Sequence, residues 1–160
     1  MTDYIKEFAG YLELERNASS NTISSYVRDV TQFSHYLLEQ ESVELPQAGT
    51  EHIERYMTYM EGKGKSTSSV ARSFASLKSY YGYLLNRGVI RRNPAKDAVA
   101  VKAERKLPQI LTGKEVELFL EQPQCVDAKG YRDHAMLELL YATGIRVSEL
   151  IGLNVEDVSL

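Results

Sequence analysis

The sequence has few of the residues that build disulfide frameworks, metal centres and membrane spans. Cys125 is the only cysteine among 160 residues, which excludes an internal disulfide, and the three histidines are scattered without the spacing of metal ligands. No apolar run approaches the length of a transmembrane helix. The first residues, in which Asp3, Lys6 and Glu7 interrupt the apolar ones, lack the pattern of a signal peptide. We therefore expect a cytoplasmic protein that contacts no membrane and holds no metal, with Cys125 as a thiol without a role.

The charge of the chain is unevenly distributed. The formal net charge is −3, yet residues 63–106 contain eleven Lys and Arg against two acidic residues, while the remainder contains eight against twenty. Basic stretches are often only solvated surface. A strongly basic block inside an acidic protein is harder to explain in that way, since phosphate neutralisation is the main sequence-independent source of DNA affinity.

Apolar spacing predicts four helices in the first hundred residues. Apolar residues recur at intervals of three and four in segments 3–16, 20–38, 50–60 and 66–87. Pro46 and Gly49 indicate a loop between the second and third helices, with Thr50 as the expected cap of the third. Gly88 is the expected end of the fourth.

The same spacing separates inward from outward positions. On the second helix, Ser25, Arg28, Gln32 and His35 are predicted to lie opposite the apolar side, and the fourth helix is predicted to turn Ser68, Arg72, Ser76 and Ser79 outward. Small hydroxyl side chains around an arginine permit close approach to DNA. Inward tyrosines, namely Tyr26, Tyr56 and Tyr81, are expected to be core aromatics with a hydrated hydroxyl.

A basic linker is predicted between two domains. The periodicity fades in residues 99–109, where Lys102, Arg105 and Lys106 precede Pro108. This divides the chain into domains at 1–98 and 110–160. The second domain opens at Thr112, which forms a Thr-x-x-Glu capping box with Glu115.

The segment 142–153, Ala-Thr-Gly-Ile-Arg-Val-Ser-Glu-Leu-Ile-Gly-Leu, carries the strongest chemical signal. It follows an apolar stretch, 135–141, that is expected to run as a helix deep into a core and to end at Gly144. Arg146 is then expected in the first turn of the next helix, among apolar neighbours, where an arginine is costly unless it meets an anion. Two interpretations remain open: a structural salt bridge to Glu149, or a phosphate site in which Glu149 holds the guanidinium.

The run 132–150, Arg-Asp-His-Ala-Met-Leu-Glu-Leu-Leu-Tyr-Ala-Thr-Gly-Ile-Arg-Val-Ser-Glu-Leu, resembles the first active-site box of the tyrosine site-specific recombinases, the phage integrase family, and in particular its Xer-like bacterial members. The resemblance implies that Arg146 binds the scissile phosphate and that Glu149 supports it. Residues 107–112 are similar to the entry of the same catalytic domain.

The first four helices resemble the core-binding, SAM-like domain of these recombinases. The resemblance rests on Asn21-Thr22, Tyr26 and Asp29, on residues 66–81 and on Arg92-Asn93-Pro94. It implies a mainly α fold, with a four-helix DNA-binding domain followed by the helical start of a catalytic domain. The second and fourth helices would cross the major groove. The DNA-binding residues implied are Thr22, Arg28, Lys65, Arg72, Lys78, Arg91 and Arg92, while Ser73 and Ser76 replace the basic residues often found in the fourth helix.

The resemblance also implies a chemistry. Family members transfer a DNA phosphoryl group to a tyrosine and rejoin strands through a phosphotyrosyl link, without metal or nucleotide cofactor, and the expected partners are double-stranded DNA and other recombinase subunits in a tetramer on paired sites. The family's remaining catalytic residues are expected beyond Leu160, and His52-Ile-Glu-Arg55 is interpreted as a chance match to the His-x-x-Arg box. We therefore expect DNA binding without cleavage, and self-association through the apolar side of residues 135–153.

Two alternatives remain at this stage. Instead of being part of a recombinase, the chain could be a naturally short, non-catalytic DNA-binding protein that competes with an intact recombinase. The second alternative is a helical interaction protein whose basic block is solvated surface. A test of DNA binding distinguishes the helical interaction protein, which would not bind DNA, from the recombinase and the short DNA-binding protein, which would.

Overall fold

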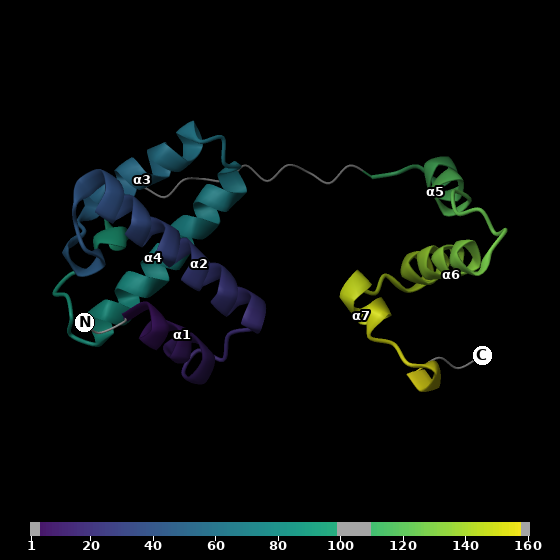
Figure 1. The fold of residues 1–160 in the computed structure, drawn as a ribbon, viewed down its shortest axis with the longest axis horizontal. Helices are drawn as coiled ribbons and strands as arrows, with labels where there is room; N and C mark the ends of the chain where they lie inside the picture. The colour runs from purple at the N-terminus through teal and green to yellow at the C-terminus, as the bar shows by residue number, and fades with distance from the viewer. Residues whose placement is uncertain (1–3, 99–109, 158–160) are drawn as a thin grey trace. The chain divides into compact units, whose positions relative to one another are not determined.

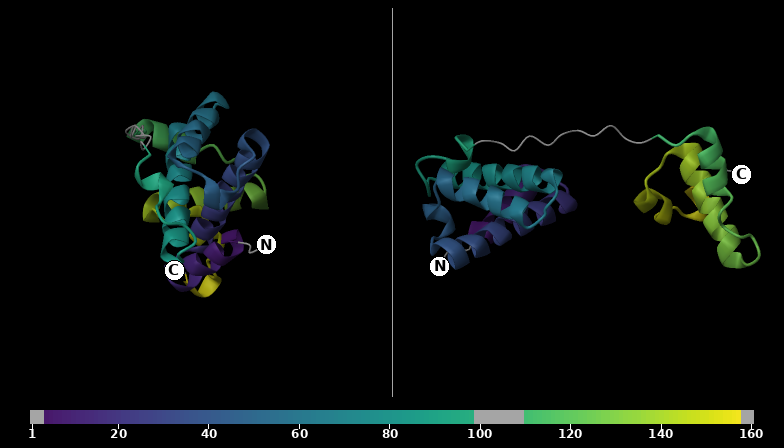
Figure 2. Two further views of the ribbon diagram at one scale, coloured as in Figure 1. Left: turned by 90° about the vertical axis from the view of Figure 1, so that its left-hand side faces the viewer. Right: turned by 90° about the horizontal axis from the view of Figure 1, so that it is seen from above.

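The computed structural model describes residues 4–98 and 110–157. Its contacts divide the chain into two compact units, Met1–Arg105 and Lys106–Leu160, here called the N-terminal and C-terminal units. The described residues form helices and no strands, which confirms the predicted mainly α fold (Figures 1 and 2). The predicted linker, 99–109, lies outside the described residues.

Four α-helices build the N-terminal unit, as predicted. They are α1 (Tyr4–Leu14), α2 (Ser20–Tyr36), α3 (Thr50–Gly62) and α4 (Thr67–Asn86). Ser19 and Ser66 cap α2 and α4, each accepting a hydrogen bond from a backbone N–H three residues on. The chain leaves α4 through Gly88, whose φ of 70° lies in the left-handed region that glycine tolerates.

The segment between α2 and α3 contains two short helical turns around the predicted loop. Helix α2 continues without interruption into a π-helical turn, Leu37–Glu41, and a 3₁₀ turn follows at Leu45–Gln47. Gly49, and not Thr50, occupies the cap position of α3. The Gly49 N–H donates to Nδ1 of His52 at 3.0 Å, while the Thr50 hydroxyl donates to the carbonyl of Pro94 at 3.0 Å. The prediction for Thr50 was wrong because a partner distant in sequence takes its hydroxyl.

The core of the N-terminal unit lies where α2 and α4 pack together, with α1 and α3 against them (Figure 1). Phe8 of α1 packs edge-on against Tyr80 of α4, with ring centroids 5.2 Å apart. Burial of each large apolar side chain contributes about 1.5–3 kcal/mol. The largest apolar side chains that are fully buried are Phe8, Phe33, Leu37, Ile53, Leu77, Tyr80, Tyr81 and Leu84.

Two of the predicted inward tyrosines, Tyr56 and Tyr81, are buried, and for Tyr81 the expected hydration of the hydroxyl was wrong. The Tyr81 hydroxyl donates to the carbonyl of Leu45 at 2.9 Å inside the core. Burial raises the pKa of Tyr56 to about 12. Tyr26 is half-buried at the edge of the core.

The C-terminal unit contains α5 (Gly113–Leu120), α6 (Ala128–Thr143), α7 (Val147–Ile151) and a 3₁₀ turn at Val155–Asp157. The predicted capping box is confirmed, because Glu115 accepts from the Thr112 N–H at 2.8 Å and Thr112 accepts from the Glu115 N–H at 3.4 Å. Helix α6 contacts α5 and α7. No residue of α6 is buried, so the prediction of a helix deep in a core was wrong for the described residues. Short helices that contact α6 on limited faces do not enclose it.

Candidate phosphate and nucleic-acid site

Arg146 lies at the junction between α6 and α7. Helix α6 ends at Gly144, whose φ of 68° is left-handed and whose N–H donates to the Leu140 carbonyl at 2.8 Å. The predicted helix end is thus confirmed. Arg146 occupies the cap position of α7, with extended backbone angles (φ −76°, ψ 152°). It therefore lies one residue before the helical turn in which it was predicted.

Glu149 holds Arg146 through two contacts. One carboxylate oxygen accepts the backbone N–H of Arg146 at 2.7 Å, and the other accepts Nη1 of its guanidinium at 2.9 Å. The hydrogen bond from the backbone, and to a lesser extent the one from the side chain, holds the pKa of Glu149 below its ordinary value. The carboxylate is thus kept ionised, and the guanidinium is tied to its own backbone.

The surroundings of Arg146 differ from the apolar setting that was predicted. Its side chain is 82% exposed, and Val147 and Ile151 beside it are also exposed. Of the neighbours, only Leu150 is buried. Arg146 therefore does not incur the cost of burying a charged side chain. What remains is an exposed guanidinium with one Nη engaged and its other donors open to an anion.

A buried polar cluster joins α2 to α4. Asp29 of α2 is 2% exposed, and its Oδ2 accepts a hydrogen bond from Oγ of Ser76 at 2.8 Å. The same oxygen lies 3.0 Å from Nη1 of Arg72. Ser76, predicted to face outward, is fully buried, as is Ser73. That prediction was wrong because Ser76 lies one helical turn after Arg72, on the side of α4 that meets α2.

Arg72 and Lys78 border an outward stripe on α4. Helical spacing places Ser68, Ala75 and Ser79 between them, and none of these three residues is buried. Lys78 is exposed, whereas Arg72 is half-buried by its ion pair. The outward side of α4 therefore has small side chains at its centre and a cation on each margin.

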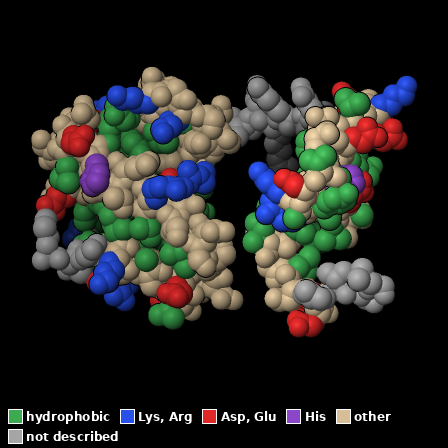
Figure 3. All heavy atoms as spheres, turned by 45° about the vertical axis from the view of Figure 1, so that its right-hand side comes forward, with side chains coloured by type: hydrophobic (Ala, Val, Ile, Leu, Met, Phe, Trp, Pro, Cys, Tyr) green, Lys and Arg blue, Asp and Glu red, His purple; other side chains and the backbone are tan. Residues whose placement is uncertain are grey.

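The remaining candidates occupy separate parts of the N-terminal unit. Arg28 is exposed on α2, while the Thr22 hydroxyl near the start of that helix hydrogen-bonds Ser19 at 2.9 Å. Lys65, between α3 and α4, lines a hollow of about 490 Å³ together with Lys63, which lies over the ring of Tyr59. Figure 3 shows several separate groups of Lys and Arg on the visible face of this unit, and not one continuous patch.

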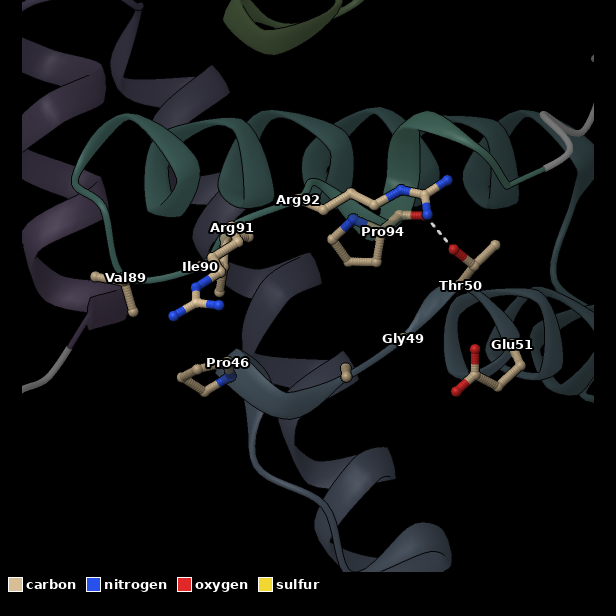
Figure 4. A pocket seen from close by; sticks show the side chains of 10 residues that line it. Pro46, Gly49, Thr50, Glu51, Val89, Ile90, Arg91, Arg92 and Pro94 are labelled. Atoms are coloured by element: carbon tan, nitrogen blue, oxygen red, sulfur yellow. Dashed lines mark hydrogen bonds between the residues drawn. The ribbon is translucent and has the colours of Figure 1, made fainter.

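Arg91 and Arg92 follow α4 and line a second hollow, of about 460 Å³ (Figure 4). The Arg91 side chain points toward Pro46, while Arg92 extends in another direction and pairs with Asp97 at 2.9 Å. Glu51 also lines this hollow, so an anion bound inside it would meet a carboxylate. These arginines are better placed to act outside the hollow. The other lining residues are Ala48, Gly49, Thr50, Val89, Ile90 and Pro94.

Asp29 and Asn93 were not predicted as site residues. Asp29 falls on the apolar side of its helix with Tyr26 and Phe33, and an acid in that position is the one signal from which burial of a charge could have been predicted. Asn93 donates through Nδ2 to the Lys78 carbonyl at 3.2 Å, and its Oδ1 accepts the Ala95 N–H at 2.9 Å. It thus attaches the segment that carries Arg91 and Arg92 to α4.

The local His-x-x-Arg sequence has a structural use in α3. His52 accepts the Gly49 N–H, and Arg55 pairs with Glu41 at 2.8 Å. Across residues 4–98 and 110–157, no cluster of three potential metal ligands occurs, and no helix is long and apolar enough to cross a membrane.

Two family models match the chain. Residues 5–88 match the phage integrase N-terminal SAM-like domain, and residues 109–160 match the phage integrase family. An N-terminal SAM-like helical domain followed by the beginning of an integrase domain defines the class. The chain belongs to the phage integrase family of tyrosine recombinases.

Relatives place it more narrowly among the Xer-like members. It is 36% identical over 161 residues to tyrosine recombinase XerC of Herpetosiphon aurantiacus, covering 100% of this chain and 53% of that protein. It is 37% identical over 160 residues to tyrosine recombinase XerD of Staphylococcus saprophyticus, and the match covers 100% of this chain and 54% of that protein. The chain thus spans about half the length of the curated relatives it matches.

Solved structures share the fold. A Tn1549 transposon integrase in complex with transposon right end DNA superposes with a TM-score of 0.69 at 24% identity, covering 99% of this chain and 50% of the other. The same integrase in complex with circular intermediate DNA gives a TM-score of 0.67 at 23% identity, and the match covers 100% of this chain and 52% of the integrase chain.

Proposed function

We propose that this chain serves site-specific DNA recombination, in which strands are cut and rejoined through a phosphotyrosyl intermediate. Its 160 residues supply duplex DNA binding through the N-terminal unit and the first active-site arginine, Arg146. Other recombinase subunits, in a tetramer on paired sites, are the protein partners. The observation that carries the proposal is Arg146, whose exposed guanidinium donates to one oxygen of Glu149 while its backbone N–H donates to the other.

Arg146 has the geometry of a phosphate ligand. Engaging Nη1 with Glu149 leaves the rest of a planar donor fork for the nonbridging oxygens of a DNA phosphate. As phosphorus passes through five-coordination, negative charge accumulates on those oxygens. A preorganised donor aimed at that charge contributes about 10²-fold or more in rate. Because Glu149 is held ionised, the donor is oriented before DNA arrives.

The N-terminal unit has a helix suited to lie along DNA. The small residues at the centre of the outward side of α4 permit close approach, and Arg72 and Lys78 on its margins match the two phosphate strands that border a groove. Arg28 adds an exposed cation on α2. Two observations support this reading: the relatives are tyrosine recombinases, and the two structurally similar integrases are in complex with DNA.

The test is the salt dependence of DNA affinity. We predict that the chain binds a fluorescently labelled duplex with an affinity that falls steeply as salt rises, because each neutralised phosphate contributes about 0.9 to the slope of log K against log salt. Replacing Lys78 and Arg28 with Ala is expected to weaken binding and reduce that slope by about 2. Fluorescence anisotropy over a salt series measures both quantities.

Lys114→Ala is the matched control, since it removes an exposed lysine from α5 in the C-terminal unit. It should leave the slope unchanged. A flat salt response of the unaltered chain would contradict the proposal and favour a helical interaction protein. Equal slopes for the unaltered chain and the Lys78→Ala, Arg28→Ala variant would place the DNA surface elsewhere.

A further inference from the structure

Asp29 is the single charged side chain that is buried among residues 4–98 and 110–157. Its Oδ2 meets Ser76 at 2.8 Å and Arg72 at 3.0 Å. A carboxylate removed from water is tolerated only with such partners. The partners explain how the chain accommodates Asp29, but they do not explain why it keeps an acid there.

Stability is a weak reason to keep this acid. A buried ion pair gains little over well-packed apolar side chains of similar volume, since desolvation offsets the Coulomb attraction. Asp29 also lies beside an apolar core to which α2 already contributes Val30 and Phe33. An apolar residue would suit that position for packing alone. The retained carboxylate therefore points to a role in placing its partner.

Asp29 holds one end of the Arg72 side chain and leaves the rest exposed. The Nη1 of Arg72 is buried and held by Asp29 through an ion pair, without a hydrogen bond, yet the side chain as a whole is 39% exposed, so the exposed surface belongs to the rest of the side chain. A guanidinium is rigid and planar, so anchoring one nitrogen restricts the direction of the other donors. Ser76 fixes the carboxylate from a second side. The arginine is thus oriented from within the fold toward the outward surface of α4.

We propose that Asp29 is a positioning residue that orients the Arg72 guanidinium toward a phosphate of duplex DNA. The inference rests on the proposed DNA binding by the N-terminal unit. The arrangement resembles that of Glu149 and Arg146, where a carboxylate also contacts Nη1, at 2.9 Å, but there through a hydrogen bond. A second difference is burial: Glu149 is half exposed, whereas Asp29 is held inside the helix packing.

If Asp29 positions Arg72, neutralising Asp29 should change the DNA affinity in the direction opposite to that expected from net charge alone. Neutralising an acid near bound DNA ordinarily strengthens binding, because the net positive charge increases. Replacing Asp29 with Asn is instead expected to weaken binding, since an unanchored guanidinium must be immobilised when DNA binds.

The experiment compares Asp29→Asn with the unaltered 160-residue chain by fluorescence anisotropy over a salt series. We expect roughly fivefold weaker binding and a slope reduced by about 1, the contribution of one phosphate. Arg72→Ala should reduce the slope equally, and the double variant should show no further loss. Circular dichroism melting establishes a temperature at which every variant is folded.

Two controls separate positioning from charge and from packing. Glu39→Gln makes the same change in charge at an exposed acid of the same unit, and it should bind equally or more tightly. Ser73→Ala changes a neighbouring buried side chain of α4 and leaves the contacts of Asp29 intact, so the slope should be unchanged even if the melting temperature changes. Tighter binding by Asp29→Asn, like that of Glu39→Gln, would show that Asp29 competes with phosphate for Arg72 and would overturn the inference.

A measurement on the unaltered chain covers the case in which Asp29→Asn fails to fold. The Arg72 Nε–H signal in nitrogen-15 NMR should be distinct and restrained in the free protein and should shift on titration with duplex DNA. A mobile, averaged signal in the free protein, or no response to DNA that binds, would also overturn the inference. Absence of any salt-dependent binding would instead contradict the proposed function itself.

Discussion

Glu149 combines two hydrogen bonds of different origin. Its bond from the Arg146 backbone fixes the entry to α7, and its bond from Nη1 fixes the side chain. The backbone bond is the larger cause of the lowered Glu149 pKa. The carboxylate would therefore stay oriented if the arginine side chain were lost, whereas the arginine depends on the carboxylate.

This dependence predicts a titration. In the unaltered chain, carbon-13 NMR of the Glu149 carboxyl should give a midpoint below the ordinary glutamate value of about 4.3. Arg146→Ala should move the midpoint upward only in part, because the N–H of residue 146 still donates. An unchanged midpoint, or a complete return to the ordinary value, would contradict the two-contact arrangement.

The sign of the pH effect follows from the direction of the shift. A carboxyl whose pKa is lower in the folded chain stabilises the fold above its unfolded pKa, and this contribution is lost as pH falls through the folded pKa. The restraint on Arg146 is therefore complete at neutral pH. It disappears only in acid, below about pH 4.

The sequence predicted the partner of Arg146 but not that of Arg72. Glu149 is three residues from Arg146, and the geometry of a helix start brings such residues together. Asp29 meets Arg72 only because α2 and α4 pack against each other, which no local spacing reveals. Ser76 was assigned to the wrong side for the same reason. Local contacts could thus be predicted, whereas contacts between helices could not.

At the scale of elements, the end of α2 is the least regular feature of the N-terminal unit. The helix widens into the π-helical turn Leu37–Glu41, and Ser42 ends it with a φ of 53°. The left-handed region costs a residue with a Cβ roughly 1–2 kcal/mol. Apolar periodicity predicted a helix to about Leu38 but contains no signal for this widening.

Ser42→Gly is predicted to stabilise the N-terminal unit. Relief of the left-handed strain exceeds the added entropy of glycine in the unfolded chain, about 0.5–1 kcal/mol, so a net gain of up to about 1 kcal/mol is expected. Urea unfolding followed by circular dichroism measures it. Asn17→Gly is the control: Asn17 has a φ of 48°, but asparagine tolerates this region, so its gain should be smaller. A loss of stability in Ser42→Gly would show that the serine side chain contributes there.

At the scale of the whole chain, the two units differ in how many of their apolar side chains are buried. The N-terminal unit has a continuous core drawn from all four helices. In the described part of the C-terminal unit only Leu150 is buried, and large apolar side chains remain exposed. Self-association through this surface stays a prediction. The exposed side chains include Leu118, Phe119, Tyr131, Tyr141, Val147 and Ile151.

This contrast predicts the course of limited trypsin digestion. The boundary between the compact units falls within the basic stretch of residues 102–106, so we expect the first cuts at Lys102, Arg105 or Lys106. The N-terminal product should persist, because the packed core that α4 shares with the other helices opposes the local unfolding that cleavage requires. The C-terminal product should be degraded further, since its lysines and arginines lie on helices without a buried core.

Mass spectrometry of timed samples identifies the order of cuts. Replacing Lys102, Arg105 and Lys106 with Gln is the matched control, and it should delay the first cut without changing the melting curve of the N-terminal unit. First cuts at Arg72, Lys78 or Arg87 would contradict the division of the chain, because those residues belong to α4 and its cap and become accessible to protease only when the core opens. Rapid loss of both products would instead show that the N-terminal core requires the rest of the chain for its stability.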